Sequence, residues 1–156
     1  MWQHVISQLT ICQPMIMDDD LSVLLANLCK AYRNQLDIAL SQHGLYVGQE
    51  MILRALWAED GQSQARLAAR LRIEPPTVSK MVRRLARIGL VTQRATAGDA
   101  RARHVWLTER GRAIRPAVEA ACQAVARQAF AGLTAAETAA LVAAMQRVYR
   151  NLADQV

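Results

Sequence analysis

Polar and basic side chains recur on one side of residues 76–84, where a helix would place them on its outer face. The inward positions, spaced as in an amphipathic helix, are Val78, Met81, Val82 and Leu85. The outward positions are Pro76, Thr77, Ser79, Lys80, Arg83 and Arg84. Hydroxyl and ammonium groups can hydrogen bond to base edges, and guanidinium groups can bind phosphate. An ordinary amphipathic helix with a charged outer face shows the same pattern, so the neighbouring elements must decide.

The segments on either side of this helix predict a helix-turn-helix followed by a β-hairpin. Ser63 is a suitable N-cap for a short helix, and residues 73–76 form the turn to the basic helix, which ends at Gly89. Two short strands follow at residues 90–94 and 103–107, joined by a polar connection at 95–100. In a helix-turn-helix the first helix braces the second, which enters the major groove of DNA.

Longer helices are predicted at both ends of the chain. Acidic residues at 18–20 favour a helix start, and apolar residues then recur at helical spacing to Leu40. A second helix, containing Ile52 and Leu53, precedes Ser63. Thr108 should begin a long alanine-rich helix that Pro116 bends, and a Thr134–Glu137 capping box opens the last helix. The apolar stripes of the terminal helices exceed what a small central lobe can cover, which predicts a dimer.

Composition and charge narrow the class of protein. The chain has 156 residues, of which 53% are hydrophobic, and a net charge of +6. Residues 62–112 hold 12 basic and 3 acidic residues, a charge of +9, and the remaining residues hold 7 and 10, a charge of −3. This basic centre favours a polyanionic partner. No apolar run approaches the roughly 20 residues of a membrane span, and the N-terminus lacks the features of a signal peptide.

Catalytic and metal-binding motifs are absent from the sequence. The histidines, His4, His43 and His104, are scattered, and there is no glycine-rich phosphate loop, paired carboxylate motif or nucleophile elbow. The three cysteines form no CxxC pair, so reduced thiols in the cytoplasm are expected. We therefore expect no enzyme activity, no cofactor and no metal.

An ordered set of short motifs runs through the central segment. It comprises Leu67-Ala68, Pro76-Thr77-Val78-Ser79, Arg84-Leu85, Gly89-Leu90-Val91, Arg94, Asp99-x-Arg101 and Val105-x-Leu107-Thr108-x-x-Gly111. In this order the motifs resemble the MarR (multiple antibiotic resistance regulator) family of bacterial regulators, and the resemblance extends over nearly the whole chain after Asp18. It implies a mainly α fold with a small β-hairpin wing: a winged helix-turn-helix with N- and C-terminal dimerisation helices. The implied function is that of a repressor that binds a pseudo-palindromic operator as a homodimer.

The resemblance also assigns roles to single residues. The outward set from Pro76 to Arg84 would read the major groove, and Arg101 at the hairpin tip would enter the flanking minor groove. Asp99 would pair with Arg94 and shape the wing, and Gln64 would contact phosphate at a helix N-terminus. This chain departs from the family at Tyr46, where Thr or Ser is usual, and at Ala86, where glutamate is common.

Two side hypotheses concern regulation. Some family members bind small aromatic anions near the dimerisation helices. The candidates for such a pocket, equally suited to a packed helical junction, are Tyr32, Arg33, Glu50, Arg54 and Trp57. Others sense peroxide through a cysteine at a position that is Ser22 here. Cys29 lies beside the apolar stripe, so we expect it to be a small buried side chain, and Cys12 is the better candidate for an exposed thiol.

The sequence thus divides into an N-terminal extension (1–17), a dimerisation helix (18–44), a winged helix-turn-helix lobe (45–108) and C-terminal dimerisation helices (109–156). Two interpretations stay open. One is a DNA-binding transcriptional regulator, and the other is a winged-helix module that binds protein without DNA. The basic outward face of residues 80–84 and Arg101 favour the regulator, because a protein-binding module has little need of a basic recognition helix.

Overall fold

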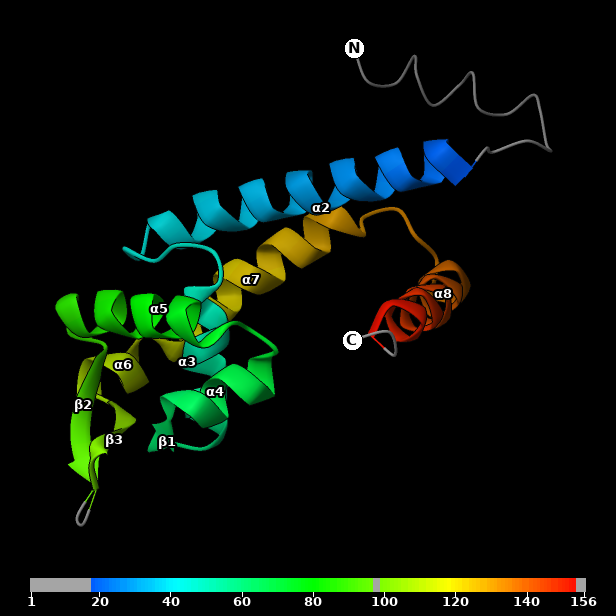
Figure 1. Cartoon of the computed structure of the whole chain (residues 1–156). Helices are drawn as coiled ribbons and strands as arrows, with labels where there is room; N and C mark the ends of the chain where they lie inside the picture. The colour runs from blue at the N-terminus through cyan, green and yellow to red at the C-terminus, as the bar shows by residue number, and fades with distance from the viewer. Residues whose placement is uncertain (1–17, 97–98, 154–156) are drawn as a thin grey trace, which may run out of the picture. The chain divides into compact units, whose positions relative to one another are not determined.

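A computed structural model describes residues 18–96 and 99–153 (Figure 1), except for the side chains at 18–19, 96 and 99–102. The chain divides into two compact units, Met1–Gln35 and Leu36–Val156. Helix α2 (Asp18–Ser41) begins in the first unit and ends in the second. Its helical spacing was predicted correctly. Apolar side chains of its first half are exposed, Leu24 by 63% and Leu28 by 52%.

Cys29 is exposed on α2, so the expectation of a buried side chain was wrong. The apolar stripe beside it is itself exposed, and no described residue of this chain covers the thiol. Cys122 is buried in the second unit. Cys12 lies outside the described residues.

Helices α4 (Gln64–Leu71) and α5 (Pro75–Arg87) of the second unit form the predicted helix-turn-helix, and α3 (Gln49–Ala58) packs against both, as Figure 1 shows. Their shared core contains the fully buried side chains of Leu40, Ile52, Leu53, Leu56, Leu67, Val78, Val82 and Leu85. Ser63 caps α4 as predicted, its hydroxyl accepting from the Arg66 amide at 3.1 Å.

The turn and the end of α5 also follow local rules. Arg72 ends α4 in the left-handed region (φ 52°), and α5 begins with proline, which needs no partner for an amide proton at that position. Gly89 adopts φ 74° just after α5, in agreement with the predicted C-terminal stop. Met81, predicted to face inward, is only half-buried.

The wing is a three-stranded antiparallel sheet in the order β1-β3-β2. Strands β2 (Val91–Thr96) and β3 (Asp99–Leu107) form the predicted hairpin, but they are longer than predicted. The expected connection at 95–100 was too long, because pairing continues past a register irregularity between Ala95 and Thr96 to the pair Thr96–Asp99. Strand β1 (Gln62–Ser63) was not predicted. It pairs with β3 and joins the wing to the start of α4.

The long helix predicted after Thr108 is instead two helices, α6 (Glu109–Ala113) and α7 (Arg115–Ala129). Pro116 lies in the first turn of α7, where its missing amide proton is tolerated, so the chain breaks at Ile114 rather than bending inside one helix. Helix α8 (Ala135–Ala153) follows. None of the described helices is long and apolar enough to cross a membrane.

The Thr134–Glu137 capping box is confirmed. The Thr134 amide and hydroxyl both donate to Glu137 Oε2 at 2.8 Å, and the Glu137 amide donates back to the Thr134 hydroxyl at 3.2 Å. These bonds to the charged form lower the pKa of the Glu137 carboxyl. None of the described α8 residues is buried.

Two side chains join the wing to the helices. Thr108 donates from its amide to the Leu90 carbonyl (3.1 Å) and from its hydroxyl to the Gly89 carbonyl (2.7 Å). Asp60 Oδ1 accepts from the amides of Gly61 (2.9 Å) and Leu107 (2.8 Å). The end of α5, the start of β2 and the end of β3 are therefore held in one place.

Candidate nucleic-acid interface

The outward face of α5 presents the polar and basic residues that the sequence predicted. Because Val78, Val82 and Leu85 are completely buried, the helix is held with its opposite side toward solvent. The exposed side chains on that side are Pro76, Thr77, Lys80, Arg83 and Arg84, and Ser79 is half-buried. Arg87, one turn beyond Arg83, is also exposed and was not among the predicted contacts.

Some basic residues near α5 are paired with carboxylates. Ion pairs of the second unit join Arg66 and Arg70 to Glu59, Arg112 to Asp60, and Arg115 to Glu119. Within the described part of the chain, Lys80, Arg83 and Arg84 form no ion pair with a carboxylate. No described carboxylate neutralises this helix face, and a face of unpaired positive charge attracts a polyanion.

Arg84 contacts an aromatic ring that sequence reasoning did not assign to the site. Its guanidinium carbon lies 4.9 Å from the centre of the Tyr46 ring, within the range of a cation–π interaction. Tyr46 precedes α3 and is separated from Arg84 by a long stretch of sequence, so no local pattern could have paired them. The sequence identifies Tyr46 only as a departure from the Thr or Ser that is usual in the family.

The N-terminus of α3 is satisfied without a hydroxyl cap. Gly48 is the N-cap and offers no side chain. Instead the Tyr46 amide donates to Gln49 Oε1 at 2.9 Å, and the Gly48 amide donates to Glu50 Oε2 at 2.6 Å. Both acceptor residues are buried, so the turn is firmly held despite the missing Thr or Ser.

Gln64 lies at the start of α4, as expected, but its side chain has a partner within the lobe. Its amide nitrogen donates to Gln93 Oε1 on β2 at 3.0 Å. This bond ties the helix-turn-helix to the wing and uses one of the two amide protons. A contact between Gln64 and phosphate therefore stays a prediction.

The wing is described only in part at the predicted residues. Arg94 is exposed, and its guanidinium carbon lies 6.0 Å from the centre of the Trp106 ring on β3. The side chains of Asp99 and Arg101 lie outside the described residues. Two predictions are therefore still open: that Asp99 pairs with Arg94, and that Arg101 enters the minor groove. The contact of Arg94 with Trp106 was not predicted from the sequence.

The residues suggested for an effector pocket are divided between the two units, and a pocket formed by them stays a prediction. Tyr32 and Arg33 belong to the first unit, and Glu50, Arg54 and Trp57 belong to the second. Glu50 is buried at the start of α3, and Trp57 donates from Nε1 to the Gly111 carbonyl at 2.8 Å. Both support the local fold. Arg54 is exposed.

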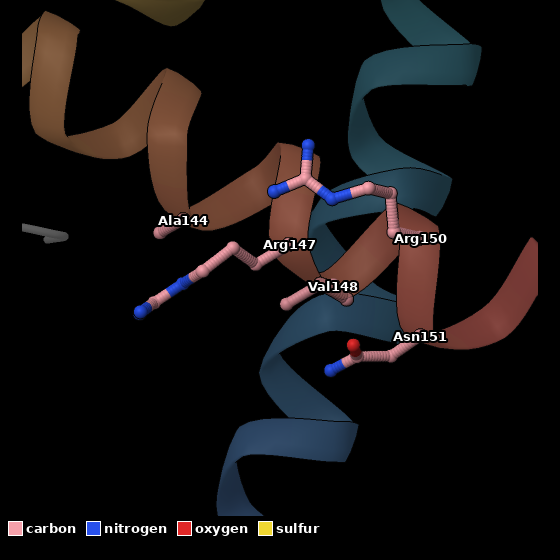
Figure 2. A pocket seen from close by; sticks show the side chains of 5 residues that line it. All are labelled: Ala144, Arg147, Val148, Arg150 and Asn151. Atoms are coloured by element: carbon pink, nitrogen blue, oxygen red, sulfur yellow. The ribbon is translucent and has the colours of Figure 1, made fainter.

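A shallow pocket is present elsewhere, on the last helix. Figure 2 shows its lining on α8, made of Ala144, Arg147, Val148, Arg150 and Asn151. Both arginine side chains extend from the helix there. None of the residues predicted for an effector lines this pocket.

Comparisons with known proteins agree with the geometry. The MarR family model matches residues 45–102. The HTH-type transcriptional repressor Rv2887 of Mycobacterium tuberculosis is 32% identical over 118 residues, which is 76% of this chain and 85% of that protein. The chain belongs to the MarR family. The predicted family resemblance and the winged helix-turn-helix fold are thereby confirmed, and the protein is a transcriptional regulator.

Solved structures show the same fold. A MarR transcriptional regulator from Methanosarcina mazei aligns with a TM-score of 0.80 at 18% identity, covering 92% of this chain and 97% of the other. A putative MarR family transcriptional regulator from Listeria monocytogenes, solved in complex with a 26mer DNA, aligns with a TM-score of 0.72 at 23% identity, covering 91% and 92%. Both alignments show that this chain has the fold of those regulators.

Proposed function

We propose that this MarR-family regulator is a repressor that binds a pseudo-palindromic operator as a homodimer, with α5 in the major groove. The uncompensated charge of Lys80, Arg83 and Arg84 on the exposed face of α5 is the observation that carries the proposal. The repressor Rv2887 and the DNA complex of the Listeria regulator support it by similarity. Operator binding places the protein with the chromosome, in the cytoplasm.

Within this proposal the residues divide by what they contact. Lys80, with Thr77 and Ser79 beside it, would hydrogen bond to base edges, because it projects from the exposed N-terminal half of the recognition helix. Arg83 and Arg84 would bind phosphates. Arg101 would enter the flanking minor groove from the wing. An effector, if it is a lipophilic anion, would use the exposed charge of Arg54.

The test of DNA binding reverses one charge on the proposed face and one elsewhere. Lys80→Glu should weaken binding to the protein's own upstream intergenic DNA by at least about tenfold, because it removes a base contact and adds repulsion. Arg127→Glu makes the same type of charge change on an exposed site of α7 and should bind as the parent protein does. Electrophoretic mobility shift at fixed salt measures both.

Two outcomes would contradict the proposal. If the parent protein retains no duplex at low salt, the chain is a winged-helix module that binds protein. If Lys80→Glu and Arg127→Glu weaken binding equally, the protein binds DNA through its overall charge and not through α5.

The homodimer is proposed from the apolar face of α8. Its exposed residues at helical spacing are Leu141, Val142, Met145, Val148, Tyr149 and Leu152. Monomeric proteins usually leave exposed no apolar patch larger than roughly 300–600 Å², so an apolar stripe along a whole helix is expected to be covered. A second copy of the chain would cover it.

Sedimentation tests the dimer. The parent protein should sediment as a dimer at micromolar concentration, and Met145→Arg should shift it toward monomer, because a buried charge at an interface is costly. Gln146→Arg adds the same side chain at the next, polar position of α8 and should leave the dimer intact. A folded parent monomer at micromolar concentration would overturn this part of the proposal.

A further inference from the structure

Tyr46 is a large aromatic side chain left 55% exposed beside the recognition helix. Its ring faces the Arg84 guanidinium at 4.9 Å, and Arg84 is itself exposed. The face of an aromatic ring carries negative charge density, which attracts a cation placed over it. The ring therefore restricts a side chain that would otherwise be free in solvent.

The backbone that carries Tyr46 is fixed from two sides. The Tyr46 amide donates to Gln49 Oε1 at 2.9 Å, and the next amide, that of Val47, donates to Asp37 Oδ1 of α2 at 3.0 Å. Gln49 is buried, with 3% of its surface exposed. The turn that precedes α3 is thus anchored at consecutive residues, and the ring is held in place by structure that does not depend on Arg84.

The same turn lies directly against α5. Gly48 has φ 97°, and a Cβ atom added there would lie 2.9 Å from Met81 Cε. Met81 and Arg84 are three residues apart and so lie on neighbouring positions of one helix face. The turn therefore contacts two neighbouring residues of the recognition helix: Gly48 lies against Met81, and the Tyr46 ring lies against Arg84.

We propose that Tyr46 is a positioning residue for DNA binding: its ring holds Arg84 in the conformation that contacts phosphate. This inference rests on the proposed function, in which Arg84 binds DNA. A long arginine side chain loses rotamer freedom when it binds, and a side chain that is already ordered loses less. Thr or Ser, which the family usually has at this position, has no ring to do this.

The test is a double-mutant cycle with a conservative rescue. Affinity for a fluorescein-labelled duplex of mixed sequence is measured by fluorescence anisotropy at low salt. Tyr46→Leu should weaken binding about five- to thirtyfold, the range of two exposed cation–π contacts, because a homodimer loses one in each copy. Tyr46→Phe, which keeps the ring, should bind as the parent does. In the Arg84→Ala background, Tyr46→Leu should have no further effect.

Several outcomes would overturn the inference. Equal affinity of Tyr46→Leu and the parent would show that the ring does not act on binding. The same loss with and without Arg84 would show that Tyr46 acts by another route, such as the stability of the turn. A loss in Tyr46→Phe equal to that in Tyr46→Leu would assign the effect to the hydroxyl.

Failure of the proposed function gives a different result. A parent protein that binds no duplex would overturn DNA binding and the role of Tyr46 together. A parent that binds while Tyr46→Leu binds equally well overturns only the role of Tyr46. Far-UV circular dichroism should be the same for all four variants and the parent, since both side chains are exposed.

Discussion

Replacing Gly111 by alanine should lower the free energy of unfolding by about 3 kcal/mol, although alanine is the better helix former. Gly111 lies in α6 and is buried. A Cβ atom there would overlap the Leu90 carbonyl oxygen and would also lie 3.2 Å from Leu107 Cδ2. The carbonyl belongs to backbone that Thr108 binds, so it cannot move without breaking the junction between α5, the wing and α6.

The expected loss of stability is opposite in direction to the effect of the same substitution in an unconstrained helix. In an unconstrained helix, glycine to alanine stabilises by about 0.5–1 kcal/mol. Urea unfolding followed by circular dichroism, at one protein concentration because a dimer's stability depends on it, measures the change. The control is Ala113→Gly at an exposed position of the same helix, which should lose no more than about 1 kcal/mol. A Gly111→Ala protein as stable as the parent would show that α6 can move away from Leu90.

Gly111 also shows what family motifs encode physically. The motif pieces Gly89-Leu90 and Leu107-Thr108-x-x-Gly111 are distant in sequence. In the structure the Thr108 hydroxyl donates to the Gly89 carbonyl and accepts from the Gly111 amide, at 2.7 and 3.0 Å. From the sequence alone, these residues can be identified only as matches to family motifs. Their contacts depend on the tertiary fold.

Local features were the ones that sequence reasoning predicted well. The caps at Ser63 and Thr134 depend on side chains within three residues of the amides they bind, so spacing alone identifies them. The inward face of α5 follows from helical periodicity for the same reason. Strand β1 was missed because a two-residue strand has no period to detect, and only its pairing with β3 defines it.

The candidate site was predictable to the same extent. Periodicity placed Lys80, Arg83 and Arg84 on the outward face, and the structure leaves them exposed. It could not show that Arg84 faces Tyr46 or that Gln64 bonds to Gln93, since both pairs join separate elements. Nor could it separate the cations of α5, which no described carboxylate pairs, from Arg66 and Arg112, which carboxylates neutralise.

Salt should have the largest effect of any variable on DNA binding. Arg83 and Arg84, with Arg87 beside them, occur twice in a dimer, and Arg101 would add to them. A protein with about 6–10 phosphate contacts loses roughly 10³–10⁵ in affinity between about 50 and 200 mM salt, because each contact releases condensed counterions. We expect a fall within this range, measured by anisotropy over a KCl series.

The slope of that dependence distinguishes phosphate contacts from base contacts. A plot of log affinity against log salt falls with a steepness of roughly 0.9 for each phosphate contact. Arg83→Ala removes two contacts from a dimer, so the plot should become less steep by about 2. It should weaken all duplexes alike. Lys80→Ala should instead cost about 1–3 kcal/mol at particular base pairs and relax specificity there. Arg127→Ala on α7 should leave both slope and sequence preference unchanged. If Arg83→Ala altered sequence preference and kept the parent slope, Arg83 would be a base-reading residue and its assignment to phosphate would be wrong.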